Sequence, residues 1–243
     1  MKMETFSLEE TAHFLPGTKV TDHYTFNGRN VPRVTDIISA CMHEEAFMQW
    51  ANRLGFQRKD YNHTLQWYAD YGTEVHEVLE KYIRTGRMPK KITHINPVQA
   101  FENWWKQIKS NNKVKVLGQE FPLTCQYYGG TYDMLLEVNG EPWLVDFKTS
   151  THISFRYMLQ LAAYRYMLKE RGIIKELRGV IVLRLFKDRP AFEEFVLDLS
   201  KDLELCFLDN CERLFNAFAY TYWWRNYLEA EFELIHKLNR ERS

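Results

Sequence analysis

The sequence predicts a mixed α/β fold in which a central β-sheet is flanked by helices. Two observations lead to it. Helical and strand patterns alternate along the 243 residues, and 45% of the residues are hydrophobic, which is enough to bury a sizeable core. This composition excludes disordered, collagen-like and low-complexity proteins. Because no internal repeat or Gly/Ser-rich linker interrupts the pattern, we expect a single domain over residues 1–243.

Three helices are predicted in the first part of the chain, after a stretch, 1–33, that lacks helical periodicity and is expected to be extended. They cover 34–56, 64–84 and 96–110. Thr35 is a candidate cap of the first helix, and Gly86 is expected to end the second. Asn96, followed by a proline, has the form of the start of the third helix.

Strand patterns then replace the helical ones. They cover 114–123, 127–138, 142–148, 177–186 and 191–197. Asn139-Gly140, a strong hairpin signal, joins the second and third of these runs, and a helix is predicted over 154–171. Helical patterns return from Leu199. The predicted parts are therefore an N-terminal helical part, an α/β core and C-terminal helices, over 1–112, 113–198 and 199–243.

The sequence predicts neither a membrane span nor a secretory signal. It has no apolar run of about 18 residues, so no membrane span is predicted. The first ten residues, MKMETFSLEE, are acidic and polar, unlike a secretory signal. The four cysteines form no CxxC pair, which favours reduced thiols. We therefore expect a cytoplasmic protein that is neither secreted nor bound to a membrane.

Charged residues are balanced overall but segregated along the chain. The 32 Lys and Arg residues offset 32 Asp and Glu residues, yet 81–115 carries nine basic residues against one acid, and 188–212 carries eight acids against two basic residues. A basic flank beside a neutral body suits an anionic polymer that is bound and then released. An ordinary solvated face would carry the same charges, so the sequence leaves both interpretations open.

Four charged side chains converge on the predicted strands. Glu120 lies in the first run, Asp133 lies in the second, and Asp146 and Lys148 end the third. Asp146 and Lys148 are two residues apart on a strand and therefore point to the same face, where a hairpin partner can place Asp133 beside them. Carboxylates at this density repel one another unless a divalent cation lies between them, and oxygen ligands select Mg²⁺ or Mn²⁺.

A hard cation beside a lysine is the combination that phosphodiester hydrolysis requires. The cation polarises the phosphate and lowers the pKa of bound water, and the lysine orients that water or offsets the developing charge. The tripeptide Asp146-Phe147-Lys148 taken alone also occurs as a simple ion pair at a strand end. The order of Glu120, Asp133 and the following helix favours the catalytic interpretation.

Several short motifs follow one another in a recognisable order. They are 72–77 (GTEVHE), Glu120, 130–133 (GTYD), 146–149 (DFKT) and 160–164 (QLAAY). Together they resemble the PD-(D/E)XK nucleases, specifically the RecB-like exonuclease branch with its QxxxY helix. The segment 32–38, with Trp50-Ala51 after it, is similar to the N-terminal segment of phage exonucleases and of the mitochondrial genome maintenance exonuclease. The resemblance spans about 31–164 and implies a restriction-endonuclease-like core with additional N- and C-terminal helices.

The resemblance also implies a role for each matching residue. The metal ligands would be His76, Asp133, Asp146 and the backbone carbonyl of Phe147. Glu120 would serve a second metal or hold a water molecule, and Lys148 would position the attacking water and stabilise the transition state. The residues expected to bind DNA are Gln160, Tyr164, Arg33, Thr35, Arg84, Arg87, Lys90, Lys91 and Thr149. Gln160 and Tyr164, four residues apart on one helical face, would contact the strand or brace the site.

Two further groups of residues allow more than one interpretation. Trp104-Trp105 and 222–224 could stack exposed bases, but aromatic residues at helical spacing more often belong to the core. Some RecB-like enzymes bind a four-iron, four-sulfur cluster, which requires four thiolates. Because only Cys206 and Cys211 follow Cys41 and the closely spaced pair is missing, we expect no iron–sulfur cluster and only Mg²⁺ or Mn²⁺ as cofactor.

The expected function is that of a Mg²⁺- or Mn²⁺-dependent deoxyribonuclease. It would act as an exonuclease on single-stranded DNA in replication, recombination or repair, in a bacterial cell or encoded by a phage, with DNA as its partner and a recombination or replication protein beside it. One alternative is an exonuclease that processes double strands together with an annealing protein. The other is a DNA-binding module with a degenerate nuclease fold, against which the complete set of acids and the lysine argues.

Overall fold

The computed structural model describes residues 24–42, 45–89 and 91–241. At its centre lies a five-stranded mixed sheet in the order β3-β4-β5-β6-β7. These strands are β3 (Val114–Thr124), β4 (Gly129–Val138), β5 (Glu141–Lys148), β6 (Gly179–Leu185) and β7 (Phe192–Asp198). β5 and β6 run parallel, and the other neighbours are antiparallel. Two short strands, β1 (Tyr24–Phe26) and β2 (Arg29–Val31), form a separate hairpin.

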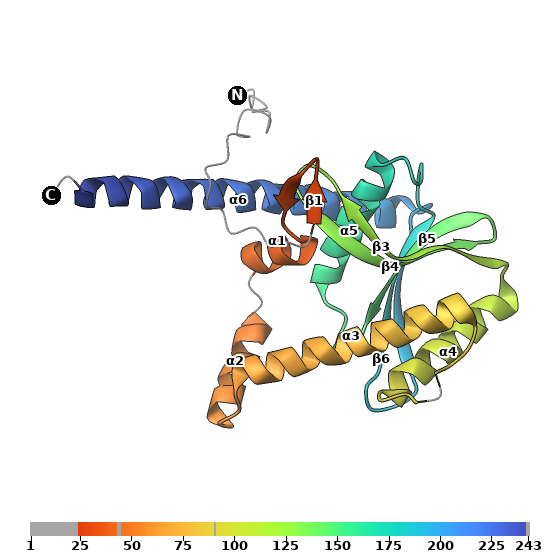
Figure 1. The fold of residues 1–243 in the computed structure, drawn as a ribbon. Coiled ribbons are helices and arrows are strands. Elements are labelled where there is room, and N and C mark those ends of the chain that lie inside the picture. The colour runs from red at the N-terminus through yellow and green to blue at the C-terminus, as the bar shows by residue number, and fades with distance from the viewer. Residues whose placement is uncertain (1–23, 43–44, 90, 242–243) are drawn as a thin grey trace.

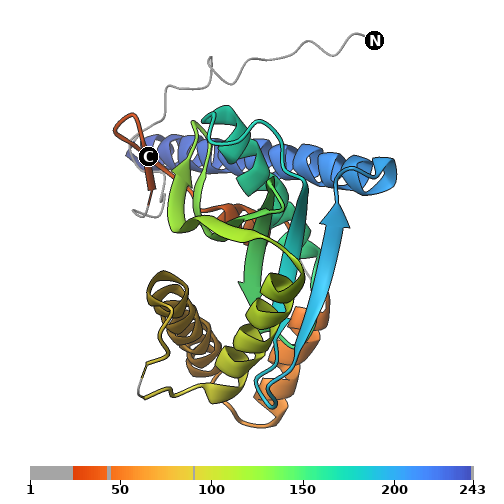
Figure 2. The same ribbon diagram turned by 90° about the vertical axis from the view of Figure 1, so that its right-hand side faces the viewer.

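Helices cover both faces of this sheet (Figures 1 and 2). One face packs on α1 (Val34–Cys41), α5 (Phe155–Glu170) and α6 (Asp202–Glu241), and the other on α3 (Tyr61–Thr85) and α4 (Ile95–Asn111). α2 (Glu45–Phe56) contacts α3. The predicted mixed α/β fold is therefore confirmed, and the order α4-β3-β4-β5-α5-β6 is consistent with a restriction-endonuclease-like core.

Local sequence signals explain where several elements begin and end. Asn139 and Gly140 both have positive φ angles, 54° and 91°, as the predicted tight hairpin between β4 and β5 requires. Gly86 adopts the left-handed conformation at the end of α3, with φ 67°, as predicted. Asp60 and Ser154 cap α3 and α5, because each side chain accepts a hydrogen bond from a backbone N–H of the first turn.

Two predictions about the N-terminal helices are wrong. The helix expected over 34–56 is divided into α1 and α2, and Met42 has an extended backbone at the end of α1. α1 packs on α5 and α6 whereas α2 packs on α3, so one straight helix could not reach both. Thr35 is not the cap, because the N-cap position belongs to Arg33. The expected extended stretch 1–33 lies outside the described residues up to position 23.

The start of α4 also differs from the prediction. The helix begins at Ile95, one residue before Asn96, with His94 at the N-cap position. The side-chain amide of Asn96 instead donates a hydrogen bond of 2.9 Å to the backbone carbonyl of Lys187. Asn96 therefore ties α4 to the turn between β6 and β7.

The C-terminal part is one helix rather than several. α6 is 40 residues long and extends beyond the body of the protein (Figure 1). Its first half is held by buried residues at intervals of three and four, from Leu208 to Tyr222. Trp223 adds a hydrogen bond of 2.9 Å from its indole N–H to the Tyr127 carbonyl. Within the described residues, no helix has the length and apolar character needed to cross a bilayer.

The edge strand β3 contains a β-bulge. Its register against β4 slips by one residue between Val116 and Gly118, so Leu117 is an additional residue in the pairing. Beyond the bulge, Glu120 has a φ of 41°, which is uncommon for a residue other than glycine. This irregular segment carries the first of the predicted acidic residues.

Candidate functional site

Three acidic residues occupy facing positions on neighbouring strands. Glu120 lies opposite Asp133, between two flanking pairs of the β3–β4 register. On the other side of β4, the last pair with β5 joins Met134 to Val145, so Asp133 and Asp146 are the next facing positions. The sheet thus aligns one acid from each of β3, β4 and β5.

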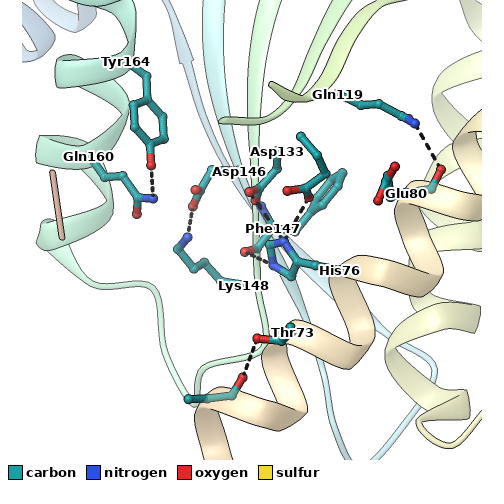
Figure 3. A network of polar contacts seen from close by, with 12 residues as sticks. Thr73, His76, Glu80, Gln119, Asp133, Asp146, Phe147, Lys148, Gln160 and Tyr164 are labelled. Carbon is teal, nitrogen blue, oxygen red and sulfur yellow. Dashed lines mark hydrogen bonds and ion pairs between the residues drawn. The ribbon is translucent and has the colours of Figure 1, made fainter. Parts of the chain in front are cut away.

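The strands β4 and β5 separate at this point, and a side chain of β4 replaces its backbone as the hydrogen-bond acceptor for β5. The Phe147 N–H donates to Asp133 Oδ2 at 2.5 Å, in place of a ladder hydrogen bond. His76 of α3 reaches the same place: its Nε2 lies 3.2 Å from the Phe147 carbonyl oxygen, and its Nδ1 lies 3.4 Å from Glu120 and 3.5 Å from Asp133. Figure 3 shows His76, Asp133 and Phe147 converging on one point.

These residues form the acidic cluster of the structure. One ligand atom each of His76, Glu120 and Asp133 lies within 4.8 Å of the others. Asp146 is not a member of this compact group. It lies beside it and pairs with Lys148, whose Nζ is 2.6 Å from Asp146 Oδ2 (Figure 3). The predicted proximity of Asp146 and Lys148 on one face of β5 is therefore observed.

Burial and neighbouring charges together set the ionisation of the cluster and of the Asp146–Lys148 pair beside it. It raises the pKa of Asp146 to about 6 and also raises the pKa of Asp133, although His76 and Lys148 act in the opposite direction. Burial alone would lower the pKa of His76, but the carboxylates of Asp133 and Glu120 raise it to about 9. The pKa of Lys148 is raised as well, because Asp146 outweighs the effect of burial. His76 and Lys148 thus supply the positive charge that the buried acids need.

Gln160 and Tyr164 lie on α5 and face the acids (Figure 3). The Gln160 amide donates a hydrogen bond of 3.0 Å to the Tyr164 hydroxyl, and Tyr164 is only 3% exposed. Burial raises the pKa of Tyr164, and the charges of Asp146 and Asp133 raise it further. The Tyr164 ring rests on Gly130, where an added Cβ would lie 2.5 Å from the ring. The glycine of the GTYD motif therefore makes room for the tyrosine of the QLAAY motif.

Replacing Gly130 with alanine is expected to destabilise the protein by about 1–3 kcal/mol, because the buried Tyr164 ring cannot move away freely. Urea unfolding measures the effect. The double variant Gly130→Ala/Tyr164→Ala removes the clash, so its loss should be smaller than the sum of the two single losses. Additive losses would contradict this packing relationship.

The residues expected to bind DNA are placed in different ways. Thr149 directly follows Lys148 and lies beside Gly72 of α3. Arg33 pairs with Asp36 at 3.0 Å, and Thr35 is exposed on α1. Arg84 reaches Glu80 at 3.5 Å. The remaining basic residues are Arg87 and Lys91, both exposed, and Lys90, which lies outside the described residues.

Other predicted groups prove to be structural. Trp104 and Trp105 are 1% and 8% exposed, and Tyr222 and Trp223 are 9% and 8% exposed, so these four aromatic residues belong to the core. Trp224, the last residue of the second group, is partly exposed. Arg165 of α5 is buried. Its guanidinium lies 2.6 Å from Asp209 of α6 and therefore joins the two helices.

The cysteines are distributed over separate parts of the fold. Cys125 and Cys211 are buried, Cys41 is half-buried and Cys206 is exposed. The thiol of Cys41 lies 3.5 Å from the Phe218 carbonyl oxygen, which it faces as a donor. Cys125 and Cys211 therefore belong to the core, whereas Cys206 does not.

Two residues near the cluster were not anticipated from the sequence. Tyr157 of α5 lies under Lys148, with the ammonium 5.0 Å from the ring centre, and it could have been found one helical turn before Gln160. Gln119 donates its amide to the Glu80 carbonyl at 3.2 Å, while its Oε1 is buried without a partner in the described part of the chain. Nothing in the sequence distinguishes Gln119 from an ordinary strand residue.

Comparisons with known proteins give similarities of structure only. No protein-family model matches the chain, and no curated protein matches it in sequence. The crystal structure of an alkaline exonuclease, LHK-Exo from Laribacter hongkongensis, is similar over 88% of this chain and 95% of its own, with 12% identity and a TM-score of 0.36. The crystal structure of SSO0001 is similar over 63% of this chain and 86% of its own, with 13% identity and a TM-score of 0.29.

Proposed function

We propose that this protein is a metal-dependent nuclease that hydrolyses phosphodiester bonds of DNA. The observation that carries the proposal is the meeting of two buried acids, Asp133 and Asp146, with His76 and Lys148 where β4 and β5 separate. Buried acids that face one another across neighbouring strands are unfavourable in a purely structural role, because each carboxylate loses its hydration. Their convergence is typical of a cation site.

The donor atoms suit a hard divalent cation. Carboxylate oxygens, one imidazole nitrogen and the Phe147 carbonyl form an oxygen-rich set without thiolates, as Mg²⁺ and Mn²⁺ prefer. Asp146 Oδ1 is buried and accepts no hydrogen bond from any described residue, so one acceptor remains for a ligand. We assign the cation to His76, Asp133 and Asp146, with Glu120 as a further ligand or water acceptor.

The cation and the side chains around it would have different roles in hydrolysis. When bound, the cation would polarise the scissile phosphate and lower the pKa of a coordinated water. Lys148, held at 2.6 Å from Asp146, would orient the attacking water and offset the charge that develops on the phosphate. Tyr164 is buried and bonded to Gln160, which supports a bracing role for this pair beside the acids.

Within this class we propose an exonuclease that acts on single-stranded DNA. The support is the ordered set of motifs from 72 to 164, together with exposed basic residues after the His76 helix, such as Arg87 and Lys91, which are available to phosphates. Oligonucleotides blocked at the 3′ or the 5′ end, compared with duplex, test this finer assignment. Equal cleavage of all substrates, including closed circles, would contradict it.

The metal requirement is tested with a labelled oligonucleotide incubated with Mg²⁺, Mn²⁺ or EDTA. We expect cleavage with Mg²⁺ or Mn²⁺ and none in EDTA, because the buried acids require a bound cation to act on an anionic substrate. Binding without cleavage under every condition would favour the DNA-binding module. Cleavage that persists in EDTA would contradict the proposed centre.

A further inference from the structure

A group of aromatic rings lies on α3, on the N-terminal side of His76. Trp67 is 51% exposed and Tyr68 is 39% exposed, and their ring centres are 5.0 Å apart in an edge-to-face arrangement. Tyr71, one turn later, is buried beneath them and contacts Trp67. α3 is anchored through Tyr71, Val75 and Leu79, and Tyr68 also contacts Trp50 of α2, with the ring centres 6.2 Å apart. These contacts leave about half of the Trp67 side chain exposed.

A single cation lies over these rings. The ammonium of Lys187, in the turn after β6, is 4.2 Å from the centre of Tyr68, 4.6 Å from Tyr71 and 5.6 Å from Trp67. The hydrogen bond from Asn96 to its carbonyl holds this turn in place. Among the described residues no carboxylate pairs with Lys187, and burial alone lowers its pKa to about 8. The turn thus presents a half-buried cation without a countercharge.

The aromatic group lies close to the acidic cluster along the same helix. Tyr71 and Trp67 precede His76 by five and nine residues, which corresponds to about 8 and 14 Å along the axis of α3. Between them, Gly72 lies beside Thr149, the residue that follows Lys148. At 3.6 residues per turn, Tyr68 is rotated by about 80° and Trp67 by about 180° from His76 around the axis of α3. A strand bound at the cluster would therefore reach Tyr68 first, and it would reach Trp67 by passing around α3.

We propose that Trp67 and Tyr68 stack unpaired bases of the DNA strand that enters the site, and that Lys187 pairs with an adjoining phosphate. This inference rests on the proposed function, and it identifies the substrate as single-stranded at this point. Exposed aromatic faces combined with a cation are the chemistry by which proteins bind single strands. An apolar protein partner fits less well, because it would bury Lys187 without a countercharge.

Equilibrium binding of a fluorescein-labelled oligothymidine in EDTA tests the inference without depending on cleavage. We expect Trp67→Ala to weaken binding about 5- to 150-fold, the effect of losing one stacked base. Trp67→Phe should restore most of the affinity, since it keeps an aromatic face. Phe232→Ala is the matched control: this residue is 70% exposed on the distal part of α6 and should leave binding unchanged.

The same binding experiment distinguishes the contribution of base stacking from that of the phosphate contact. Lys187→Gln should lower the slope of log affinity against log salt by about 0.7, the value for one phosphate contact on a single strand. Blunt duplex should bind equally to wild type and Trp67→Ala, because its bases are already stacked on each other. Retained oligothymidine affinity in Trp67→Ala, or an equal loss with duplex, would overturn the inference.

Failure of this inference and failure of the nuclease proposal give different results. If no metal supports cleavage but Trp67→Ala still loses affinity for the single strand, the proposed function fails and the stacking surface stands. If cleavage is metal-dependent and Trp67→Ala binds like wild type, the surface fails and the nuclease stands.

Discussion

Replacing Asp146 with asparagine is expected to reduce DNA cleavage by about 10³-fold or more, the loss typical of removing one preorganised charge from a catalytic centre. The amide keeps the shape of the side chain but removes the negative charge that faces Lys148 and the Asp133 position. Initial rates on a labelled single-stranded oligonucleotide, with Mn²⁺ at several concentrations, measure the effect. A loss that more metal restores would indicate weaker cation binding rather than a lost chemical step.

The matched variant Lys148→Met should lose a similar factor without recovering at high metal concentration, since a lysine does not bind the cation. Glu77→Gln provides the control, because this acid is exposed on α3 next to His76. It should retain the wild-type rate. If Asp146→Asn and Lys148→Met cleaved DNA as fast as Glu77→Gln, the proposed centre would be wrong.

Replacing Gly179 with alanine is expected to have the largest effect on stability, about 3 kcal/mol of unfolding free energy. Gly179 begins β6, which lies between β5 and β7, and an added Cβ would collide with the Trp143 ring and with the backbone carbonyl of Leu197. A backbone atom held in a strand cannot turn aside as a side chain can. The strain must therefore be spread over β5, β6 and β7.

Urea unfolding measures this loss as a lower midpoint at an unchanged m-value. Gly55→Ala is the matched control, because an added Cβ meets nothing within 4 Å there and alanine favours helix. Its stability should equal or slightly exceed that of the wild type. Equal midpoints for Gly179→Ala and Gly55→Ala would show that the sheet accommodates the methyl group.

Local signals predicted most elements of the fold because they depend on a few neighbouring residues. Asn139 and Gly140 form the hairpin turn, and Gly86 ends α3, through their own backbone conformations and independently of the surrounding packing. The division of the helix predicted over 34–56 depends instead on which distant helices α1 and α2 contact. The predicted capping role of Asn96 is wrong for the same reason, because its side-chain amide donates a hydrogen bond to a backbone carbonyl 91 residues later in the chain.

The candidate site was predicted in its composition but not in its geometry. The order of motifs named His76, Asp133 and Asp146, yet only the separation of β4 from β5 explains how the His76 ring reaches the Phe147 carbonyl. The aromatic group on α3 was not predicted, because the sequence positions of Trp67 and Tyr68 do not distinguish them from buried aromatic residues of a helix. The cation that lies over them comes from a turn more than a hundred residues later.

The additional residue in β3 decides which chemical group stands opposite Asp133. If Leu117 were taken up into the pairing with β4, every later residue of β3 would slide by one place, and Gln119 would occupy the position of Glu120. A neutral amide would then replace a carboxylate at the edge of the cluster. The β-bulge therefore fixes the register that places Glu120, rather than Gln119, opposite Asp133.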